Sequence, residues 1–483
     1  MRQRRRAGSS CSAMEMSTQG ENLRLRREIG LISAVSLIAG TMIGSGIFMS
    51  PEWVLHYTGS LAGSLLIWAA CGLLAMFGAL SYAELGTLIK ESGGDYIYIL
   101  RNFGSLPAFL FAYTSVIVVR PAGVAAISLS FAEYAVAPFY PGCSSPQSAV
   151  KCTAAACILF LAIINCLSVR LATAIMNLFT FAKLLALLVI VVGGVVLLVN
   201  GQTQSFQNAF QNTNAGIGSI GVAFYQGLWS YDGWNNLNFV TEELQKPEVN
   251  LPRAVMIAIP LVTCLYLLVN VSYFAAMTPT ELLSSGAVAI SWGNKVLGSW
   301  MWLISLSVAV SSLGSANGTL FTGGRTCYIA AREGHMPDVL SMAHVQRLTP
   351  SPALIFTSAV ALIMIIPGSF SSIVNFFSFT AWIFYGMTIT CLLYLKIKKP
   401  ELPRSYKVPI LIPIIVLMAS FYLVLAPIID QPQIEFLYVI LFILSGVLVY
   451  FPLIRYRCHC RFLQRLTLHL QLLLEVAPIE KNV

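Results

Sequence analysis

Long apolar segments recur along almost the whole of this 483-residue sequence. Each is close in length to the roughly 20 residues that an α-helix needs to cross a lipid bilayer. Charged residues make up only 10% of the chain, against about 25% in soluble domains. The sequence therefore predicts an all-α membrane protein with twelve transmembrane helices, of which the division within 354–396 is the least well defined by hydropathy. The predicted spans are 31–57, 62–89, 104–138, 151–169, 172–199, 217–242, 253–277, 296–325, 352–369, 371–396, 409–428 and 434–455.

Lysine and arginine residues in short loops indicate how such a chain is oriented, because cytoplasmic loops carry an excess of them. The two ends of the chain and the loops on the same side hold most of these residues, whereas the opposite side has little more than Lys151 and Lys295. We therefore expect a cytoplasmic tail at 1–28, a twelve-span domain at 29–455, and a cytoplasmic tail with an amphipathic helix at 456–483. The net charge of +9 follows from this bias and does not indicate nucleic acid as a partner. The expected surroundings are a lipid bilayer.

The first span is interrupted by the stretch "GTMIGSGIFMSP" at 40–51. A break at 44–46 would leave the amides of Ser45, Gly46 and Ile47 at the start of a new half-helix, where the helix dipole favours an anion. The last carbonyls of the preceding half-helix, around Ile43, would favour a cation. The alternative is a helix-packing motif, since Gly40 and Gly44 have the small-xxx-small spacing.

The stretch "FYQGLWSYDGWNNLNFVTEEL" at 224–244 interrupts the sixth span, at Gly227, Ser230, Asp232 and Gly233. Unpaired backbone groups are tolerated at membrane depth only inside protein or beside a water-filled cavity. Two interrupted helices in corresponding positions of two halves are the best sequence indicator of a binding site in a transporter. We therefore expect an inverted repeat of five plus five helices, with broken helices 1 and 6 and two additional helices at the end.

Asp232 is the one acidic residue predicted to lie deep in a span. A central aspartate costs roughly 2.5–3.5 kcal/mol on insertion, so it is a candidate for a functional side chain that lines a cavity. The alternative is a structural ion pair with a buried base, either Lys183 or Arg120. Other acids fall near the predicted ends of spans, where solvation or pairing is easy: Glu84, Glu133, Glu242 and Glu243.

Three further residues have more than one interpretation. Lys183 could pair with an acid, or its ammonium could take the place of a sodium ion that would otherwise brace the fold. Trp229 could be an ordinary membrane aromatic or could cap a bound ligand. Cys143 lies in a predicted outer loop, where it could bond another chain, bond Cys152, or stay a free thiol.

Six stretches in a fixed order resemble the light-chain subunits of heteromeric amino acid transporters, an L-type family within the amino acid–polyamine–organocation superfamily. They are "GTMIGSGIF", "LSYAELGTLIKESGGDYIYI", "FAKLLAL", "LWSYDGWNNLNFVTEEL", "AREGHMP" and "YKVPILIPI". Within that family the sequence is most similar to members that exchange cystine, dibasic and neutral amino acids, or to an aromatic-preferring relative. The similarity extends from about residue 28 to the C-terminus.

The resemblance implies sodium-independent, obligatory exchange of L-amino acids at the plasma membrane, without a cofactor. It also implies that Trp229 gates the site, that Asp232 favours a cationic side chain, and that Lys183 replaces a sodium ion. Cys143 matches the cysteine that bonds a single-span glycoprotein heavy chain. The residues implied to surround the α-carboxylate and α-ammonium groups of the substrate are Met42, Ile43, Gly44, Ser45, Gly46 and Ile47.

Other classes of function stay open from the residues alone. A channel or receptor could use the same scaffold, and the nearest alternative is an ion- or proton-coupled amino acid symporter or uniporter. An intramembrane enzyme is not expected, because no nucleophile–base pair or metal-ligand cluster is evident in the sequence.

Overall fold

The computed structural model describes residues 29–91, 93–140, 143, 145–347, 349–430, 432, 434–456 and 461–478. The predicted N-terminal tail at 1–28 lies outside these residues. The helices of the first half are α1 (Leu31–Met42), α2 (Gly46–Thr58), α3 (Leu61–Leu88), α4 (Asp95–Phe103), α5 (Ser105–Thr114), α6 (Arg120–Val136), α7 (Gln147–Leu167), α8 (Val169–Val199) and α9 (Ile217–Ser230). Those of the second half are α10 (Pro247–Ala276), α11 (Pro279–Leu283), α12 (Val288–Val296), α13 (Met301–Arg332), α14 (Ser351–Ile365), α15 (Phe370–Lys398), α16 (Leu411–Asp430), α17 (Ile434–Tyr450) and α18 (Arg461–Leu474).

Short segments of tighter or wider helix join several of these elements. The 3₁₀ turns are η2 (Ala137–Phe139), η3 (Gln204–Phe206), η4 (Asn236–Glu243), η5 (Gly298–Trp300) and η6 (Asp338–Ser341), and the π-helical segments are η1 (Ser115–Val119) and η7 (Phe451–Arg455). Strands β1 (Met342–His344) and β2 (Val476–Pro478) pair antiparallel, with Ala343 opposite Ala477. The structure is thus helical throughout its membrane part, as predicted, with one two-stranded ribbon at an end.

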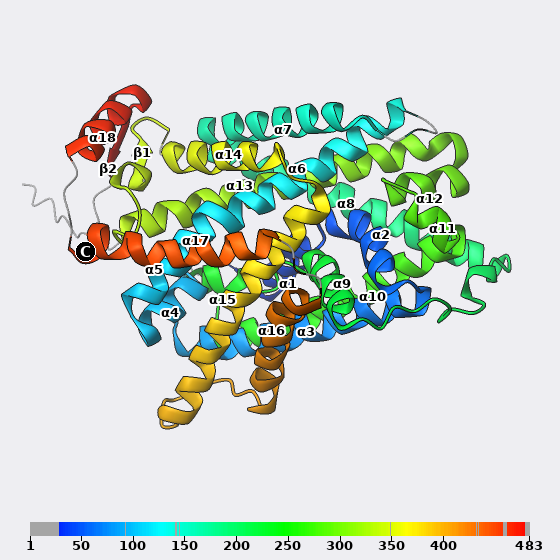
Figure 1. Ribbon diagram of the computed structural model, residues 1–483, viewed down its shortest axis with the longest axis horizontal. Helices are drawn as coiled ribbons and strands as arrows, with labels where there is room; N and C mark the ends of the chain where they lie inside the picture. The colour runs from blue at the N-terminus through cyan, green and yellow to red at the C-terminus, as the bar shows by residue number, and fades with distance from the viewer. Residues whose placement is uncertain are drawn as a thin grey trace, which may run out of the picture.

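Most of the long helices run roughly along the longest axis of the molecule, whereas α15 and α16 cross it steeply (Figure 1). Seven of them in the described part of the chain are long and apolar enough to cross a membrane, or eight if the bent pair α1 and α2 counts as one span. Three shorter apolar helices, at 183–199, 351–365 and 436–452, fall below that length. The predicted count of twelve spans is therefore not confirmed by length and composition, although α14 and α15 are separate helices at the division expected within 354–396.

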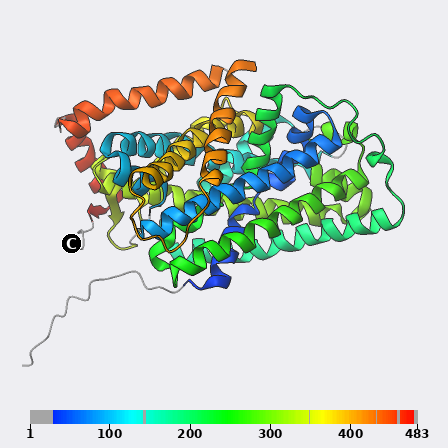
Figure 2. The same ribbon diagram turned by 90° about the horizontal axis from the view of Figure 1, so that it is seen from below.

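The bundle keeps apolar side chains on its outside as well as in its core. Figure 2 shows α17 and α8 on opposite faces of the bundle. On α7, the side chains of Leu159, Phe160 and Ile163 are more than half exposed. Such faces are stable against hydrocarbon and would be costly in water, so the surface fits a chain that lies in a bilayer.

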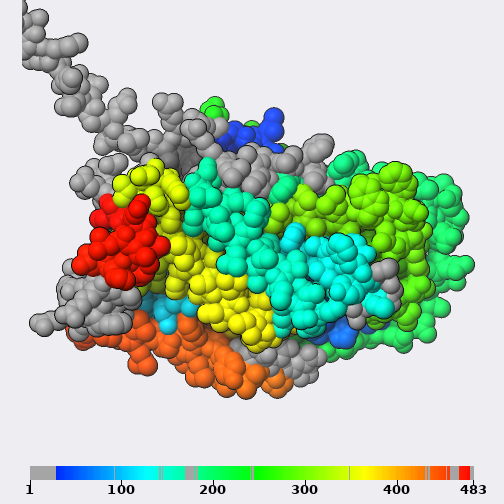
Figure 3. Space-filling model, turned by 90° about the horizontal axis from the view of Figure 1, so that it is seen from above, coloured from blue at the N-terminus to red at the C-terminus, as the bar shows by residue number. Residues whose placement is uncertain are grey.

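The two ends of the bundle differ in what covers them. At one end, α18 lies beside η6, and β2 pairs with β1 just after it, so that the C-terminal segment is seated on the chain between α13 and α14 (Figures 1 and 3). At the other end lie α11 and α12 (Figure 1), where Lys295 pairs with Glu281 at 2.6 Å. The predicted amphipathic C-terminal helix thus corresponds to α18.

Several helices begin at a residue suited to that position. Ser60 precedes α3 and accepts a hydrogen bond from the Gly63 amide at 3.1 Å. Ser369 caps α15, and Thr278 caps α11 in a capping box with Glu281. These side chains satisfy amides that the first turn of a helix leaves without acceptors.

Glu84, which the sequence placed near the end of a span, is fully buried between α3 and the segment that follows α15. Its carboxylate pairs with the Lys396 ammonium at 2.7 Å, lies 3.4 Å from Nε of Arg404, and accepts the Val408 amide at 2.9 Å. Pairing, and not solvation, therefore stabilises this acid. These contacts hold the segment that joins α15 to α16 against α3.

Replacing Glu84 by glutamine should destabilise the protein substantially, because Lys396 and Arg404 would then be buried without a counter-charge. Removing one partner of a buried pair costs about 3–5 kcal/mol. Thermal unfolding of the purified protein measures the loss. Glu248→Gln is the matched control: its partner Lys90 lies 2.5 Å away, but both side chains are more than one-third exposed, so a loss below about 1 kcal/mol is expected. Equal losses in the two variants would contradict this role for Glu84.

Candidate functional site

The predicted interruption of the first span is present, between α1 and α2. Helix α1 ends at Met42, α2 begins at Gly46, and the two axes are bent by 50°. Among the described residues, no backbone acceptor lies within hydrogen-bond range of the amides of Ser45, Gly46 and Ile47. The carbonyls of Ile43 and Gly44 likewise have no backbone donor there. The break therefore has backbone amides without backbone acceptors beside backbone carbonyls without backbone donors. This arrangement suits a ligand that carries an anionic and a cationic group together.

The two interrupted helices meet at this break. A Cβ atom built on Gly46 would lie 2.5 Å from Oγ and 2.7 Å from Cα of Ser230, the last residue of α9. Tyr266 of α10 holds the same junction, because its hydroxyl lies 2.6 Å from the Met42 carbonyl and 2.8 Å from the Ser230 carbonyl. One phenol thus ties the carbonyl end of α1 to that of α9.

Gly46→Ala should abolish the transport that the resemblance implies, because the added methyl group would collide with backbone as well as side-chain atoms of Ser230. Overpacking of this kind typically costs about 1–3 kcal/mol and forces the backbone to move. Uptake by reconstituted protein, normalised to folded protein, measures the effect. Gly293→Ala on α12 is the control, since the nearest atoms to its added methyl, Cα and Cβ of Met301, lie at an ordinary 3.5 Å. If Gly46→Ala transported as well as Gly293→Ala, the close contact between α2 and α9 would not matter for function.

The second interruption begins later than the sequence suggested. Gly227 lies inside α9, and its lack of a side chain makes room for Sγ of Cys71, which would be 2.7 Å from a Cβ atom there. The predicted break at Gly227 is therefore wrong. The helix ends at Ser230, the chain turns through Gly233 with φ of +100°, and η4 continues as a 3₁₀ helix.

Asp232 lies in this turn and lines a small cavity between α9 and α15. The Tyr385 hydroxyl donates to its carboxylate at 3.4 Å. Within the described part of the chain, no lysine, arginine or histidine nitrogen lies within 4 Å of Asp232. The guanidinium of Arg120 instead lies over the Phe239 ring at 5.6 Å and acts on Asp232 only through its longer-range charge. The alternative of a direct structural ion pair with Lys183 or Arg120 is not what the structure contains.

Trp229 and Phe377 of α15 line the same cavity, and Trp229 also contacts Phe370 of α15. The Trp229 ring meets Phe377 edge-on at a centroid distance of 4.9 Å and Phe370 at 6.3 Å. Phe370 also lines the large outer cavity described below. These three rings therefore separate the outer cavity from the one that contains Asp232, where a gate would stand.

Lys183 is buried on α8, and its ammonium donates to the Gly40 carbonyl at 2.7 Å. Gly40 lies in the last turn of α1, just before the break. The positive charge thus sits against the carbonyl end of the first half-helix, where the helix dipole stabilises a cation. This geometry fits the second interpretation of Lys183, as an ammonium in place of a bracing metal ion.

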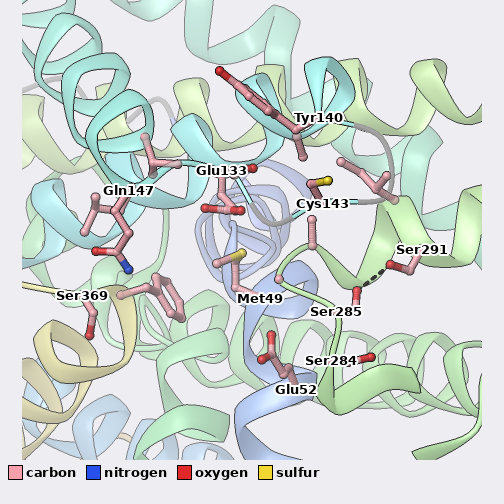
Figure 4. A pocket seen from close by; sticks show the side chains of 18 of the residues that line it. Met49, Glu52, Glu133, Tyr140, Cys143, Gln147, Ser284, Ser285, Ser291 and Ser369 are labelled. Atoms are coloured by element: carbon pink, nitrogen blue, oxygen red, sulfur yellow. Dashed lines mark hydrogen bonds between the residues drawn. The ribbon is translucent and has the colours of Figure 1, made fainter. Parts of the chain in front are cut away.

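A cavity of about 630 Å³ opens on the other side of Trp229, at the end of the bundle that carries α11 and α12. Figure 4 shows Met49 at its centre, with the carboxylate of Glu133 above it and that of Glu52 below it. Cys143, exposed and without a disulfide in the structure, is on the rim. Cys152 is also exposed and free, so the local bridge between these two is absent.

Sequence reasoning did not identify Tyr266, Phe377 or Tyr385 as part of the site. For the two tyrosines the only signal was a hydroxyl-bearing ring inside an apolar run, which is "LVTCLYLLVN" for Tyr266 and "AWIFYGM" for Tyr385. Nineteen tyrosines occur in the chain, so this signal selects poorly. No group of three or more His, Cys, Asp or Glu side chains in the described residues could hold a metal ion.

Comparison with known proteins agrees with this geometry. Residues 29–451 match the amino acid permease family. The chain is 51% identical to the human b(0,+)-type amino acid transporter 1, over all of this chain and 99% of that protein. It is 42% identical to the human large neutral amino acids transporter small subunit 2, over 95% of this chain and 87% of that protein. It is also 42% identical to the human cystine/glutamate transporter, over 96% and 93% of the two chains. The protein therefore belongs to the amino acid permease family, whose members are membrane transporters and not enzymes.

Proposed function

We propose that this protein is a sodium-independent L-amino acid antiporter. Its substrates would be neutral amino acids, including aromatic ones, and cationic amino acids, with cystine as a further candidate. The observation that carries the proposal is the junction of α1, α2 and α9, where free amides and free carbonyls lie beside Ser230, two residues before Asp232. The names of the relatives, which include a b(0,+)-type transporter and a cystine/glutamate transporter, support amino acids as substrates.

The proposed mechanism is alternating access around this junction. The amides of Ser45, Gly46 and Ile47 would receive the α-carboxylate, and the carbonyls near Ile43, with Met42 and Gly44 beside them, the α-ammonium. These groups are common to all amino acids, so the backbone would bind the shared part of the substrate. Trp229 would cover the substrate from the outer cavity, and Asp232 would receive a cationic side chain.

Lys183 accounts for the independence from sodium in this proposal. Its ammonium already holds the Gly40 carbonyl at 2.7 Å. A metal ion at the same carbonyl would face a fixed positive charge, which makes its binding unfavourable. Coupling to a sodium gradient is therefore not expected.

The proposed assembly is a heterodimer in the plasma membrane, with both termini in the cytoplasm. Cys143 would form a disulfide with a single-span glycoprotein heavy chain. Three features support this: the exposure of Cys143, its lack of a local disulfide partner, and the name of one relative, which describes it as a small subunit. The predicted excess of basic residues on one side supports the orientation.

Exchange by purified protein in sodium-free liposomes tests the function. Labelled arginine and labelled tyrosine are supplied outside, each with and without unlabelled amino acid inside. Uptake that requires internal amino acid establishes an antiporter. Uptake that is indifferent to internal substrate would indicate a uniporter, and uptake that appears only with sodium or a proton gradient would indicate a symporter.

A further inference from the structure

We propose that the Tyr385 hydroxyl substitutes for the cationic group of the substrate when a neutral amino acid is bound. It would donate to Asp232 in that state and give way to a guanidinium or ammonium group when a cationic amino acid is bound. Tyr385 would then be the residue that lets one site accept both classes. This inference rests on the proposed function and concerns the side-chain end of the same site.

A carboxylate inside a membrane protein needs a partner in every state of the transport cycle, because a charge without one is costly to desolvate. A cationic substrate brings such a partner with it, but leucine or tyrosine does not. In the structure the side-chain donor to Asp232 is Tyr385 of α15, at 3.4 Å. This donor carries no charge, so it does not compete permanently with a cation.

The ring of Tyr385 is fixed by its neighbours. Tyr82, Trp234 and Trp382 meet it edge-on or nearly so, at centroid distances of 6.3, 5.1 and 5.5 Å. Both Tyr385 and Asp232 line the small cavity between α9 and α15. The hydroxyl therefore reaches the carboxylate without any change in ring position, and only the O–H bond has to rotate when a stronger donor arrives.

The length of this hydrogen bond fits the role. A phenol and a carboxylate usually approach to 2.5–2.7 Å when their bond is strong, and 3.4 Å is near the upper limit for any hydrogen bond. The interaction is thus weak enough for a charge-assisted bond from a substrate to replace it. A buried lysine or arginine in the same position would exclude cationic substrates altogether.

Tyr385→Phe removes the hydroxyl and keeps the ring, so it tests the idea with little change in packing. We expect KM for leucine to rise by about five-fold or more relative to KM for arginine, since leaving a buried carboxylate without its donor costs about 1 kcal/mol or more. Both values come from one preparation of proteoliposomes, so their ratio does not depend on the amount of folded protein. Should Tyr385→Phe be inactive with both substrates, stabilisation of the purified variant by leucine and by arginine in thermal unfolding replaces uptake as the measurement.

Tyr82→Phe is the matched control. Its hydroxyl donates to a different buried acid, Asp95, which also accepts the Thr388 hydroxyl at 2.9 Å. The same chemical change in the same aromatic layer should leave the leucine-to-arginine ratio as in the wild type. In a background of Asp232→Asn, where no carboxylate needs a partner, Tyr385→Phe should likewise leave the ratio unchanged.

The inference is overturned if Tyr385→Phe affects leucine and arginine equally, or if its effect persists in the Asp232→Asn background. Either result would give Tyr385 a structural role only. Failure of the proposed function would look different: the wild-type protein itself would then show no exchange, or Asp232→Asn would not distinguish arginine from leucine.

Discussion

Asp232→Asn is expected to lower kcat/KM for arginine by at least about 30-fold, while that for leucine or tyrosine changes by less than about three-fold. Truncating one partner of a buried charge pair typically costs about 2–5 kcal/mol, and 2 kcal/mol corresponds to about 30-fold. The asparagine keeps the size of the side chain and an oxygen that can still accept from Tyr385. Only the charge offered to a cationic substrate is lost. Initial rates of exchange in proteoliposomes, over a range of concentrations of each amino acid, give the three constants.

Asp95→Asn is the control for this prediction. Asp95 is also buried and has Tyr82, Thr388 and Asn235 as donors, but it does not line the cavity that contains Asp232. Any loss in this variant should be the same for arginine and leucine. Equal loss of the two substrates in Asp232→Asn would remove Asp232 from the account of selectivity and leave it a structural role.

Cys143→Ser should eliminate the covalent complex with a heavy chain completely. The expected result is the disappearance of a high-mass band on non-reducing gels when the two chains are expressed together. Exchange by the reconstituted variant should persist, because the side chain lies on the rim of the outer cavity and Trp229 separates that cavity from the one with Asp232. Cys152→Ser, which changes the other exposed cysteine of this region, should keep the high-mass band. Survival of the complex in Cys143→Ser would show that another cysteine forms the link.

Local chemistry explains why some features could be read from the sequence. Glycines and a serine in close succession inside an apolar run disfavour a continuous helix, and the break between α1 and α2 is at the predicted residues, whereas Pro51 lies inside α2. An aspartate inside an apolar run is rare for a similarly local reason, so Asp232 was identifiable. The same reasoning failed at Gly227, because a glycine in a helix also serves close packing, here against Cys71. Local pattern does not distinguish the two uses.

The sequence by itself determined that the chain is a helical membrane protein, that its first and a later helix are interrupted, and that Asp232 stands at the second interruption. Only the tertiary structure decided which residues contact these features. Tyr385 is 153 positions from Asp232, and Tyr266 is 224 positions from Met42, yet single hydroxyls join them. Glu84 and Lys396 are even farther apart in the chain and form one buried pair. Such partners depend on how helices pack across the bundle. The residues next to each one in the sequence do not indicate which distant residue it will contact.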